Sequence, residues 1–353
     1  MTLESLGWDE AFAADFQSYS NSGFLPARVI RAHRHACDVF TSSGLLPAAC
    51  TGKMLHDAKT HAELPVVGDW VVARKRPTEA RMDIHAVLPR RTKFSRRAAG
   101  ERDKEQVLAA NVDTVFLVSS LDDNYNLRRI ERYLMLARES GAEPIVVLNK
   151  ADLHKDPTVA QAEVAAVALG VTVVVLSALE NNGLEALEPW LQPGRTVALL
   201  GSSGVGKSTL INCLLGEEVQ DTGDISIVNH KGRHTTTHRE LFVTPSGALV
   251  IDTPGMREVQ FWQSETASVD DTFTDISQLA QQCRFHDCRH NGEPGCAVLA
   301  ALNSGELDDA RWGSFQKLQL EQAYAARKAE ASLERVARSS WKKLTQQAKK
   351  YTK

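Results

Sequence analysis

The sequence lacks a long apolar run, an export signal and a strong net charge. No segment approaches the roughly 20 consecutive apolar residues that a membrane-spanning helix needs. The first ten residues are acidic and have neither the basic start nor the apolar core of a signal peptide. The net charge is only −3, so any nucleic-acid binding must come from local patches rather than from the whole surface. We therefore expect a soluble protein of the cytoplasm.

The chain contains only six cysteines, and three of them lie close together. Cys283, Cys288 and Cys296 fall within one short segment, which also contains His290. In a chain without an export signal, such clustering favours metal binding over disulfide bonds. Three thiolates and one imidazole are the ligands of a closed, tetrahedral structural Zn²⁺ site. A metal-free or redox-active cluster is the alternative, and His286 competes with His290 as the fourth ligand.

Short β-rich runs occupy much of residues 25–100. Turn residues such as Gly44, Gly52 and Gly68 separate them. Short strands of this kind are typical of a small barrel, most often an OB-fold, although another small β-barrel or a sandwich would give the same pattern. The runs lie at residues 27–32, 36–40, 46–51, 69–74 and 82–87. The basic segment 90–97 follows, and it is either a solvated linker or an RNA-facing edge.

From residue 106 to 252, apolar β runs alternate with helical segments, which indicates a parallel sheet covered on both faces. One junction in this region reads G-x-x-x-x-G-K-S between a β run and a helix, the context of a phosphate-binding loop. Backbone N–H groups of such a loop surround phosphate oxygens, the lysine reaches the β- and γ-phosphates and the serine holds Mg²⁺. The alternative is a glycine turn before an ordinary helix. The candidate residues are Gly201, Ser202, Ser203, Gly204, Val205, Gly206, Lys207 and Ser208, with Thr209 next.

Two segments before that loop point to guanine as the base. Asn149, Lys150 and Asp152 follow a buried β run, where side chains emerge at the carboxyl edge of a sheet. A buried Asp152 carboxylate accepts hydrogen bonds from guanine N1–H and its exocyclic amine, and adenine has no matching donors. Lys150 would lie over the base plane. Ser177 and Ala178, after the next β run, fit the backbone turn that contacts guanine O6.

A third segment follows the loop. Asp252 ends a β run and would hold Mg²⁺ through water, and the Gly255 N–H would sense the γ-phosphate. Residues 232–238 supply hydroxyls for a switch, and one of three consecutive threonines, taken here as Thr236, would be the second Mg²⁺ ligand beside Ser208. Without these neighbours the stretch would be a polar surface loop.

Together these segments resemble the guanine-nucleotide motifs of the GTPase superfamily, but in the order of a circular permutation. The base-recognising segments precede the phosphate loop, whereas in ordinary GTPases they follow the third motif, which is residues 252–255 here. Joining the old ends and cutting elsewhere leaves spatial neighbours intact, so the same site can form. The chain then leaves the core directly after the segment that senses the γ-phosphate.

With a barrel, a permuted GTPase and a Cys3His loop in that order, the chain resembles the ribosome small-subunit-dependent GTPase A (RsgA) family. The resemblance covers about residues 25–330 and rests on the motif order, the zinc loop, the switch at 232–237 and the barrel segment 65–70. It implies a cytoplasmic bacterial GTPase that binds the small (30S) ribosomal subunit late in assembly, contacts 16S rRNA and is activated by that subunit.

The residue after the third motif bears on catalysis. Ordinary GTPases place a water-orienting glutamine there, but Met256 stands here, so intrinsic hydrolysis should be slow. His234 is the family's candidate for positioning the attacking water, because an imidazole can accept its proton. A solvent-exposed loop histidine is the plain alternative.

We therefore expect a multidomain protein that binds GTP with Mg²⁺ and one structural Zn²⁺ and works as a monomer. The expected parts are an N-terminal extension (1–24), an N-terminal OB-fold β-barrel that binds RNA (25–100), a central circularly permuted α/β P-loop GTPase domain (101–262) and a C-terminal zinc-binding α-helical domain (263–353). The basic residues 338–353 are either a subunit-facing tail or a solvated helix end.

Two other functions stay open at this point. One is an RNA-binding module in which the nucleotide is a structural ligand and its turnover incidental. The other is a GTP-dependent signalling switch with a protein effector, against which the β-barrel and the basic segments argue. Stimulation of hydrolysis by small subunits distinguishes the enzyme from the RNA-binding module, and a salt-insensitive partner that needs no RNA would favour the signalling switch.

Overall fold

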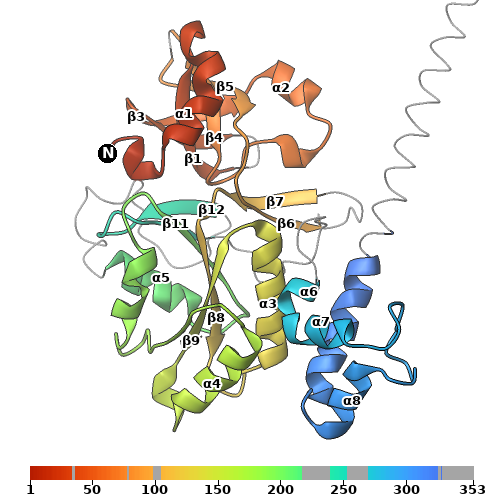
Figure 1. The fold of residues 1–353 in the computed structure, drawn as a ribbon. Helices are drawn as coiled ribbons and strands as arrows, with labels where there is room; N and C mark the ends of the chain where they lie inside the picture. Colours follow the sequence, from red (N-terminus) through yellow and green to blue (C-terminus); the bar gives the residue numbers. More distant parts are fainter. Residues whose placement is uncertain are drawn as a thin grey trace, which may run out of the picture. The chain divides into compact units, whose positions relative to one another are not determined.

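The computed structural model describes residues 1–33, 36–77, 79–97, 105–216, 239–252, 269–324 and 327. The chain divides into two compact units, which are described separately (Figure 1). The first unit comprises Met1–Arg96 with Glu105–Gln260, and the second comprises Arg97–Lys104 with Phe261–Lys353. Among the described residues, no helix has the length and apolarity needed to cross a bilayer.

The first unit begins with a five-stranded OB-like barrel, as the β-rich runs predict. The strands are β1 (Leu25–Ala32), β2 (Cys37–Thr41), β3 (Gly44–Cys50), β4 (Trp70–Lys75) and β5 (Met82–Val87). They follow the order β1-β2-β3-β5-β4, and antiparallel pairing of β1 with β4 closes the barrel. Val29, Val39, Val71 and Ile84 fill its interior, each at most 1% exposed. Helix α2 (Gly52–Asp57) and the 3-10 turn η3 (His61–Glu63) connect β3 to β4.

The first 22 residues pack against this barrel. They form η1 (Glu4–Leu6), α1 (Glu10–Phe16) and η2 (Gln17–Ser22). The Trp8 ring contacts Trp70 of β4 edge-on, with centroids 4.7 Å apart, and Leu6 and Phe12 are buried. Arg28 of β1 donates from Nη1 to the Leu6 carbonyl at 2.8 Å. The segment is therefore a part of the unit's core.

The basic segment 90–97 is partly a strand. Strand β6 (Lys93–Arg97) pairs with β7 (Glu105–Ala110) in a two-stranded sheet. Acidic side chains from distant parts of the chain bind three of its cations: Asp69 pairs with Arg90, Asp9 with Arg91 and Glu105 with Lys93. The segment is therefore not a linker, and part of its positive charge is paired within the fold. Whether this edge faces RNA stays a prediction.

A parallel sheet follows the barrel and is continuous with it. Its order is β10-β9-β8-β11-β13, and β12 pairs antiparallel with both β13 and barrel strand β1. The parallel order places the carboxyl ends of these strands at one edge. The strands are β8 (Thr114–Ser120), β9 (Glu143–Asn149), β10 (Val173–Val175), β11 (Thr196–Leu200), β12 (Arg239–Val243) and β13 (Leu249–Asp252).

Helices cover this sheet, as the alternating pattern predicts. Residues of α5 and η5 join side chains from β8 and β9 in one apolar cluster, which includes Leu210, Leu187 and Phe116. Helices α3 and α4 pack against β8 to β10 and against each other. The helical elements are α3 (Leu127–Ser140), η4 (Ala151–Leu153), α4 (Pro157–Val167), η5 (Leu184–Trp190) and α5 (Lys207–Leu215).

The described part of the second unit is helical. It contains α6 (Val269–Thr272), α7 (Thr274–Gln281), α8 (Ala297–Ser304) and a helix at residues 309–324. Phe273 and Phe315 pack edge to face, with centroids 5.5 Å apart, in a small buried core. Arg311 and Asp275 form a two-pronged ion pair beside it.

Candidate nucleotide site and metal centre

The predicted phosphate loop joins the buried strand β11 to helix α5. Gly204 and Gly206 adopt φ values of +81° and +94°, which favour glycine. A Cβ on Gly206 would lie 2.3 Å from Asn149 Nδ2, and one on Gly201 would lie 2.4 Å from the Val118 carbonyl oxygen. Glycine is therefore required at 206 by both backbone conformation and close approach, at 204 by backbone conformation and at 201 by close approach.

Lys207 is the first residue of α5 and reaches back over the loop. Its Nζ donates to the carbonyl oxygens of Gly201 at 2.7 Å and Ser202 at 2.6 Å. Ser208 and Thr209 follow in the first turn of the helix and are exposed. The arrangement places an ammonium group, a hydroxyl and free helix N–H groups at one location, which suits a bound anion.

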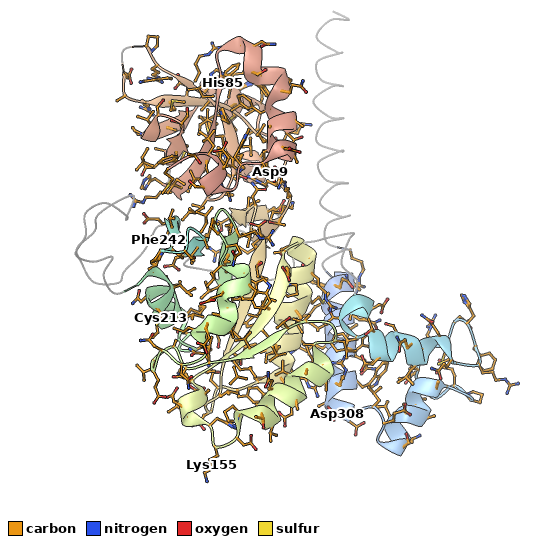
Figure 2. The ribbon with its side chains drawn as sticks, turned by 60° about the vertical axis from the view of Figure 1, so that its left-hand side comes forward. Asp9, His85, Lys155, Cys213, Phe242 and Asp308 are labelled. Atoms are coloured by element: carbon orange, nitrogen blue, oxygen red, sulfur yellow. The ribbon has the colours of Figure 1, made fainter. Side chains whose placement is uncertain are left out.

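Asn149 connects the phosphate loop with the predicted base-recognition turn. It ends β9 and is 2% exposed. Its Nδ2 donates to the Val205 carbonyl at 2.9 Å, and its Oδ1 accepts from the Ala178 N–H at 3.0 Å. Cys213 of α5 (Figure 2) donates its thiol to the carbonyl oxygen of Ala178 at 3.1 Å. The structure thus brings three sequence-predicted segments together at one edge of the sheet.

Lys150 and Asp152 lie beside this turn. Lys150 adopts a left-handed backbone conformation, with φ +63°, and Asp152 lies in the following turn η4. The Ser177 hydroxyl donates to Asp152 Oδ1, which orients the carboxylate. Asp152 is exposed, whereas the sequence argument assumed a buried carboxylate. The difference arises because the residue lies beyond the end of β9, outside the strand's covered part.

A polar segment between β8 and α3 also belongs to this site, and sequence reasoning missed it. Asp122 Oδ2 accepts from Lys150 Nζ at 2.8 Å. Burial raises the pKa of Asp122, but hydrogen bonds from Lys150 and Ser120 outweigh burial and lower that pKa to about 2. Asn124 Nδ2 donates to Ser202 Oγ at 3.2 Å, and Arg129 Nη1 donates to the same oxygen at 3.0 Å.

The sheet order explains why this segment reaches both motifs. Strand β8 lies between β9, which precedes the base-recognising residues, and β11, which precedes the phosphate loop. Whatever follows β8 at the carboxyl edge must therefore lie between the two. The signal in the sequence is the polar stretch that begins directly after the buried β8 run at Ser120.

Asp252 is the last residue of β13, and β13 runs parallel to β11 with Ile251 opposite Ala198. This register places Asp252 at the same carboxyl edge as the phosphate loop. The remaining predicted residues of the nucleotide site, His234, Thr236 and Gly255, lie outside the described residues.

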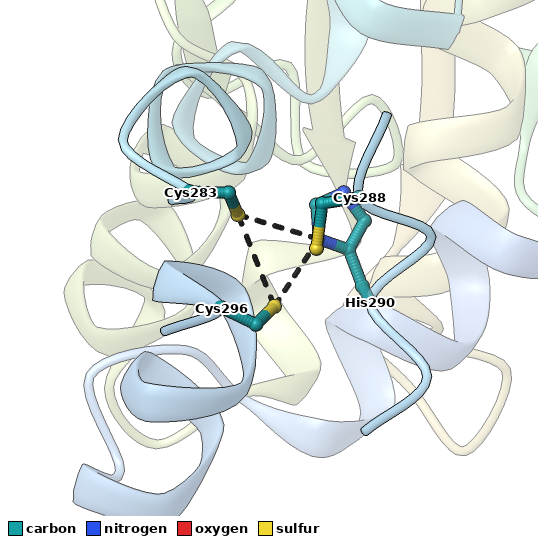
Figure 3. A group of neighbouring side chains, drawn as sticks. All are labelled: Cys283, Cys288, His290 and Cys296. Atoms are coloured by element: carbon teal, nitrogen blue, oxygen red, sulfur yellow. Dashed lines mark hydrogen bonds between the residues drawn. The ribbon is translucent and has the colours of Figure 1, made fainter. Parts of the chain in front are cut away.

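The four predicted metal ligands converge in the second unit (Figure 3). Their ligand atoms all lie within 4.8 Å of one another. The Sγ atoms of Cys283 and Cys296 are 3.8 Å apart, and His290 Nδ1 is 3.6 and 3.3 Å from them. Tetrahedral coordination with Zn–S bonds near 2.3 Å separates two sulfurs by about 3.8 Å. All three cysteines, including Cys288, are free thiols, so the donor set fits a metal ion.

Neighbouring groups hold these ligands in place. The N–H groups of Ala297 and Leu299 donate to the sulfurs of Cys283 and Cys296, at 3.3 and 3.4 Å. The ring of Trp312 contacts the His290 ring edge-on, with centroids 5.8 Å apart. Such contacts orient ligands before and after a metal binds.

Comparison with known proteins gives a consistent result. The RsgA GTPase family matches residues 87–262. A relative from Opitutus terrae, named small ribosomal subunit biogenesis GTPase RsgA, is 58% identical over 98% of this chain and 96% of its own length. A relative of the same name from Methanosarcina acetivorans is 44% identical over 98% of this chain and 92% of its own.

Solved structures with a similar fold include YjeQ from Thermotoga maritima, with a TM-score of 0.62 and 26% identity. The match covers 85% of this chain and 99% of that one. YloQ, described as a circularly permuted GTPase, gives a TM-score of 0.60 and 26% identity, with 86% of this chain and 97% of that one covered.

Proposed function

The chain belongs to the RsgA GTPase family and is a GTP hydrolase, and from that premise we propose that it is a ribosome-stimulated enzyme of late 30S subunit maturation. It would hydrolyse GTP to GDP and phosphate while bound to the subunit. The observation that carries the proposal is the assembly of the phosphate loop with Asn149 and Ala178 at one sheet edge, in permuted chain order. The names of the relatives supply the ribosomal context.

In this proposal each motif holds one part of the nucleotide. The phosphate loop, residues 201–209, surrounds the phosphates, and Lys207 turns from the loop carbonyls to the β- and γ-phosphates. Asp152 accepts from guanine N1–H and the exocyclic amine, and binding of the base covers the carboxylate that is exposed here. Lys150 lies over the base, and the turn at Ser177 and Ala178 contacts O6.

Mg²⁺ would be held by Ser208 directly and by Asp252 through water, with Thr236 as the further ligand. When bound, the ion neutralises charge that develops between the β- and γ-phosphates. Gly255 senses the γ-phosphate. His234 positions the attacking water in place of the glutamine that Met256 replaces.

We further propose that the cluster of Cys283, Cys288, His290 and Cys296 holds zinc. The spacing of the sulfurs and the closed donor set support a structural ion with four protein ligands. The ion would supply folding free energy to a loop region with little core of its own.

The barrel would contact 16S rRNA, and the protein would work as a monomer in the cytoplasm, where subunits are assembled. Support for RNA binding comes from the OB-like topology, which other proteins use to bind oligonucleotides. The internal pairing of Arg90, Arg91 and Lys93 argues that the contact uses other cations of the barrel.

The decisive experiment measures GTP hydrolysis by the full chain alone, with purified small ribosomal subunits and with large subunits. We expect slow turnover alone and strong stimulation by small subunits only. The variant His234→Ala should lose the stimulated rate, by about 100-fold or more, and keep GTP binding, because general-base assistance contributes on that scale.

Tight GTP binding without stimulation would contradict the proposed enzyme and favour a nucleotide-stabilised RNA-binding module. Stimulated turnover that persists in His234→Ala would remove that histidine from the mechanism without touching the ribosomal proposal.

A further inference from the structure

Arg129 makes three hydrogen bonds beside the phosphate loop. It lies in the first turn of α3, and its Nη1 donates to Ser202 Oγ at 3.0 Å, to Asn124 Oδ1 at 2.8 Å and to the Asn124 carbonyl at 3.3 Å. Asn124 Nδ2 in turn donates to Ser202 Oγ at 3.2 Å and lies 3.5 Å from the Ser203 carbonyl. The three side chains therefore form a closed triangle on the outer part of the loop.

Two kinds of contact hold this outer part: one reaches its carbonyl oxygens and the other reaches the Ser202 hydroxyl. Lys207 and Asn149 hold the loop at Gly201, Ser202 and Val205, through carbonyl oxygens only. The Ser202 hydroxyl is bound solely by the two donors from the β8–α3 segment. The Ser202 side chain thus depends on residues that no nucleotide motif includes, while Lys207 holds the Ser202 carbonyl.

The charge of Arg129 is also uncompensated. Within the described chain no carboxylate pairs with it, and all its hydrogen-bond partners are neutral oxygens. The nearby Asp122 is already paired with Lys150 at 2.8 Å. A half-buried guanidinium without a counter-ion attracts an anion that binds at the adjacent phosphate loop, and the attraction grows with the charge of that anion.

We propose that Arg129, held by Asn124, is a positioning residue for the nucleotide: it fixes the Ser202–Ser203 arm of the phosphate loop and favours the triphosphate over the diphosphate. The inference rests on the proposed GTP site. The residue acts through the loop and through its charge, and it takes no part in bond breaking.

The same segment carries Asp122, which holds Lys150 of the base-recognising motif. One short connection after β8 therefore reaches both the base end and the phosphate end of the nucleotide. Loss of Arg129 should disturb the phosphate end alone, because the Asp122–Lys150 pair does not involve it.

The test compares Arg129→Met, Arg129→Lys and Asn124→Ala with the unchanged full chain, using equilibrium binding of GDP and of a non-hydrolysable GTP analogue. Arg129→Met should weaken triphosphate binding by about tenfold, the scale of one lost charge-assisted hydrogen bond, and diphosphate binding by less. Arg129→Lys should restore the preference for triphosphate but not the full affinity, because lysine keeps the charge but not the planar guanidinium whose Nη1 contacts both Asn124 and Ser202.

Arg138→Met is the matched control. It removes a cation from the far end of the same helix, where the guanidinium lies near the Leu169 carbonyl at 3.5 Å. This variant should bind both nucleotides as the unchanged chain does. In the subunit-stimulated assay Arg129→Met should raise KM for GTP and leave kcat within about twofold, the pattern of lost ground-state binding.

Suppose that Arg129→Met unfolds at the same temperature as the unchanged chain. The inference is then overturned if the variant binds GDP and the GTP analogue equally more weakly, or if it binds both as tightly as before. If Arg129→Met unfolds at a lower temperature, binding by Asn124→Ala tests the inference instead, because this variant removes the neutral partner of Arg129 and keeps the Arg129 charge. Failure of the unchanged chain to bind guanine nucleotides would instead defeat the proposed function itself.

Discussion

In the proposed GTP site, Asp152 would determine the base through the number of hydrogen bonds it accepts. A carboxylate accepts two, and guanine offers two donors on one edge. In Asp152→Asn one acceptor becomes a donor, which matches xanthine, whose corresponding edge has one donor and one carbonyl. We expect this variant to lose GTP binding by at least about 100-fold, because a charge-assisted pair is replaced by a donor–donor clash, and to gain XTP binding. Competition between the two nucleotides measures the exchange.

Ser177→Ala serves as the comparison for that variant. It removes the hydroxyl that orients the Asp152 carboxylate and leaves the carboxylate itself. It should weaken GTP binding less than Asp152→Asn does and without any gain for XTP, because it removes one hydrogen bond to the carboxylate and keeps both acceptors. Undiminished GTP selectivity in Asp152→Asn would place base recognition elsewhere.

The residues that sequence reasoning could identify are those with a diagnostic spacing. Lys207 and Asn149 stand in motifs whose residue types follow from phosphate and guanine chemistry, and the structure brings both motifs together. Asp122, Asn124 and Arg129 have no such spacing. Their relevance depends on β8 lying between β9 and β11, which is a property of the sheet and not of the local sequence.

At the scale of elements, boundaries were predictable where local chemistry fixes them. Helix α3 spans Leu127–Ser140, because Asn126 caps its start and Gly141, with φ +83°, ends it. Strand β6 was missed because its cations suggested solvent exposure. The partners Asp9 and Asp69 lie well before this segment in the sequence, and Glu105 lies on the next strand. The local sequence therefore does not show that the charges of these cations are neutralised.

The metal loop is the element with the least apolar support. Removing the ion with a chelator, or replacing a ligand in Cys288→Ser, should unfold the region around α7 and α8, because four ligands with no large core depend on the metal. Zinc content by elemental analysis should fall from one ion per chain to less than about 0.2, and protection from hydrogen exchange should be lost between residues 283 and 304.

Cys50→Ser in the barrel is the control for that experiment, since Cys50 is a free thiol far from the cluster in sequence. It should keep its zinc. Full protection of the 283–304 region after complete metal removal would show that the loop folds without an ion.

At the scale of the whole molecule, the sequence predicts the permuted motif order, but it does not predict that the barrel and the parallel sheet are continuous. Strand β12 pairs with β1 at Arg31 opposite Glu240, and an ion pair joins the same two residues. They are 209 positions apart, and neither segment contains a local signal that predicts this pairing. The same limit applies to the first 22 residues, whose partner Trp70 lies on β4.

Those first residues provide the last prediction. Leu6, Phe12 and Phe16 are 0, 2 and 7% exposed, and burying each such side chain contributes about 1.5–3 kcal/mol. A chain that begins at residue 24 loses all three and leaves Arg28 without the Leu6 carbonyl that it binds. The summed loss is a large fraction of the roughly 5–15 kcal/mol that stabilises a typical domain. The shortened chain should therefore unfold at least about 10 °C below the full chain.

The point variant Leu6→Ala separates the packing of this segment from the effect of shortening the chain. It should lower the unfolding temperature by an intermediate amount, because it removes one buried side chain and keeps the carbonyl that Arg28 binds. Tyr19→Ala, in the same segment but only half-buried, should change it little. If the shortened chain and Leu6→Ala both unfold at the same temperature as the full chain, the segment is a dispensable extension. If both unfolding temperatures are lower, in the expected order, residues 1–23 belong to the folding unit that carries the proposed nucleotide site.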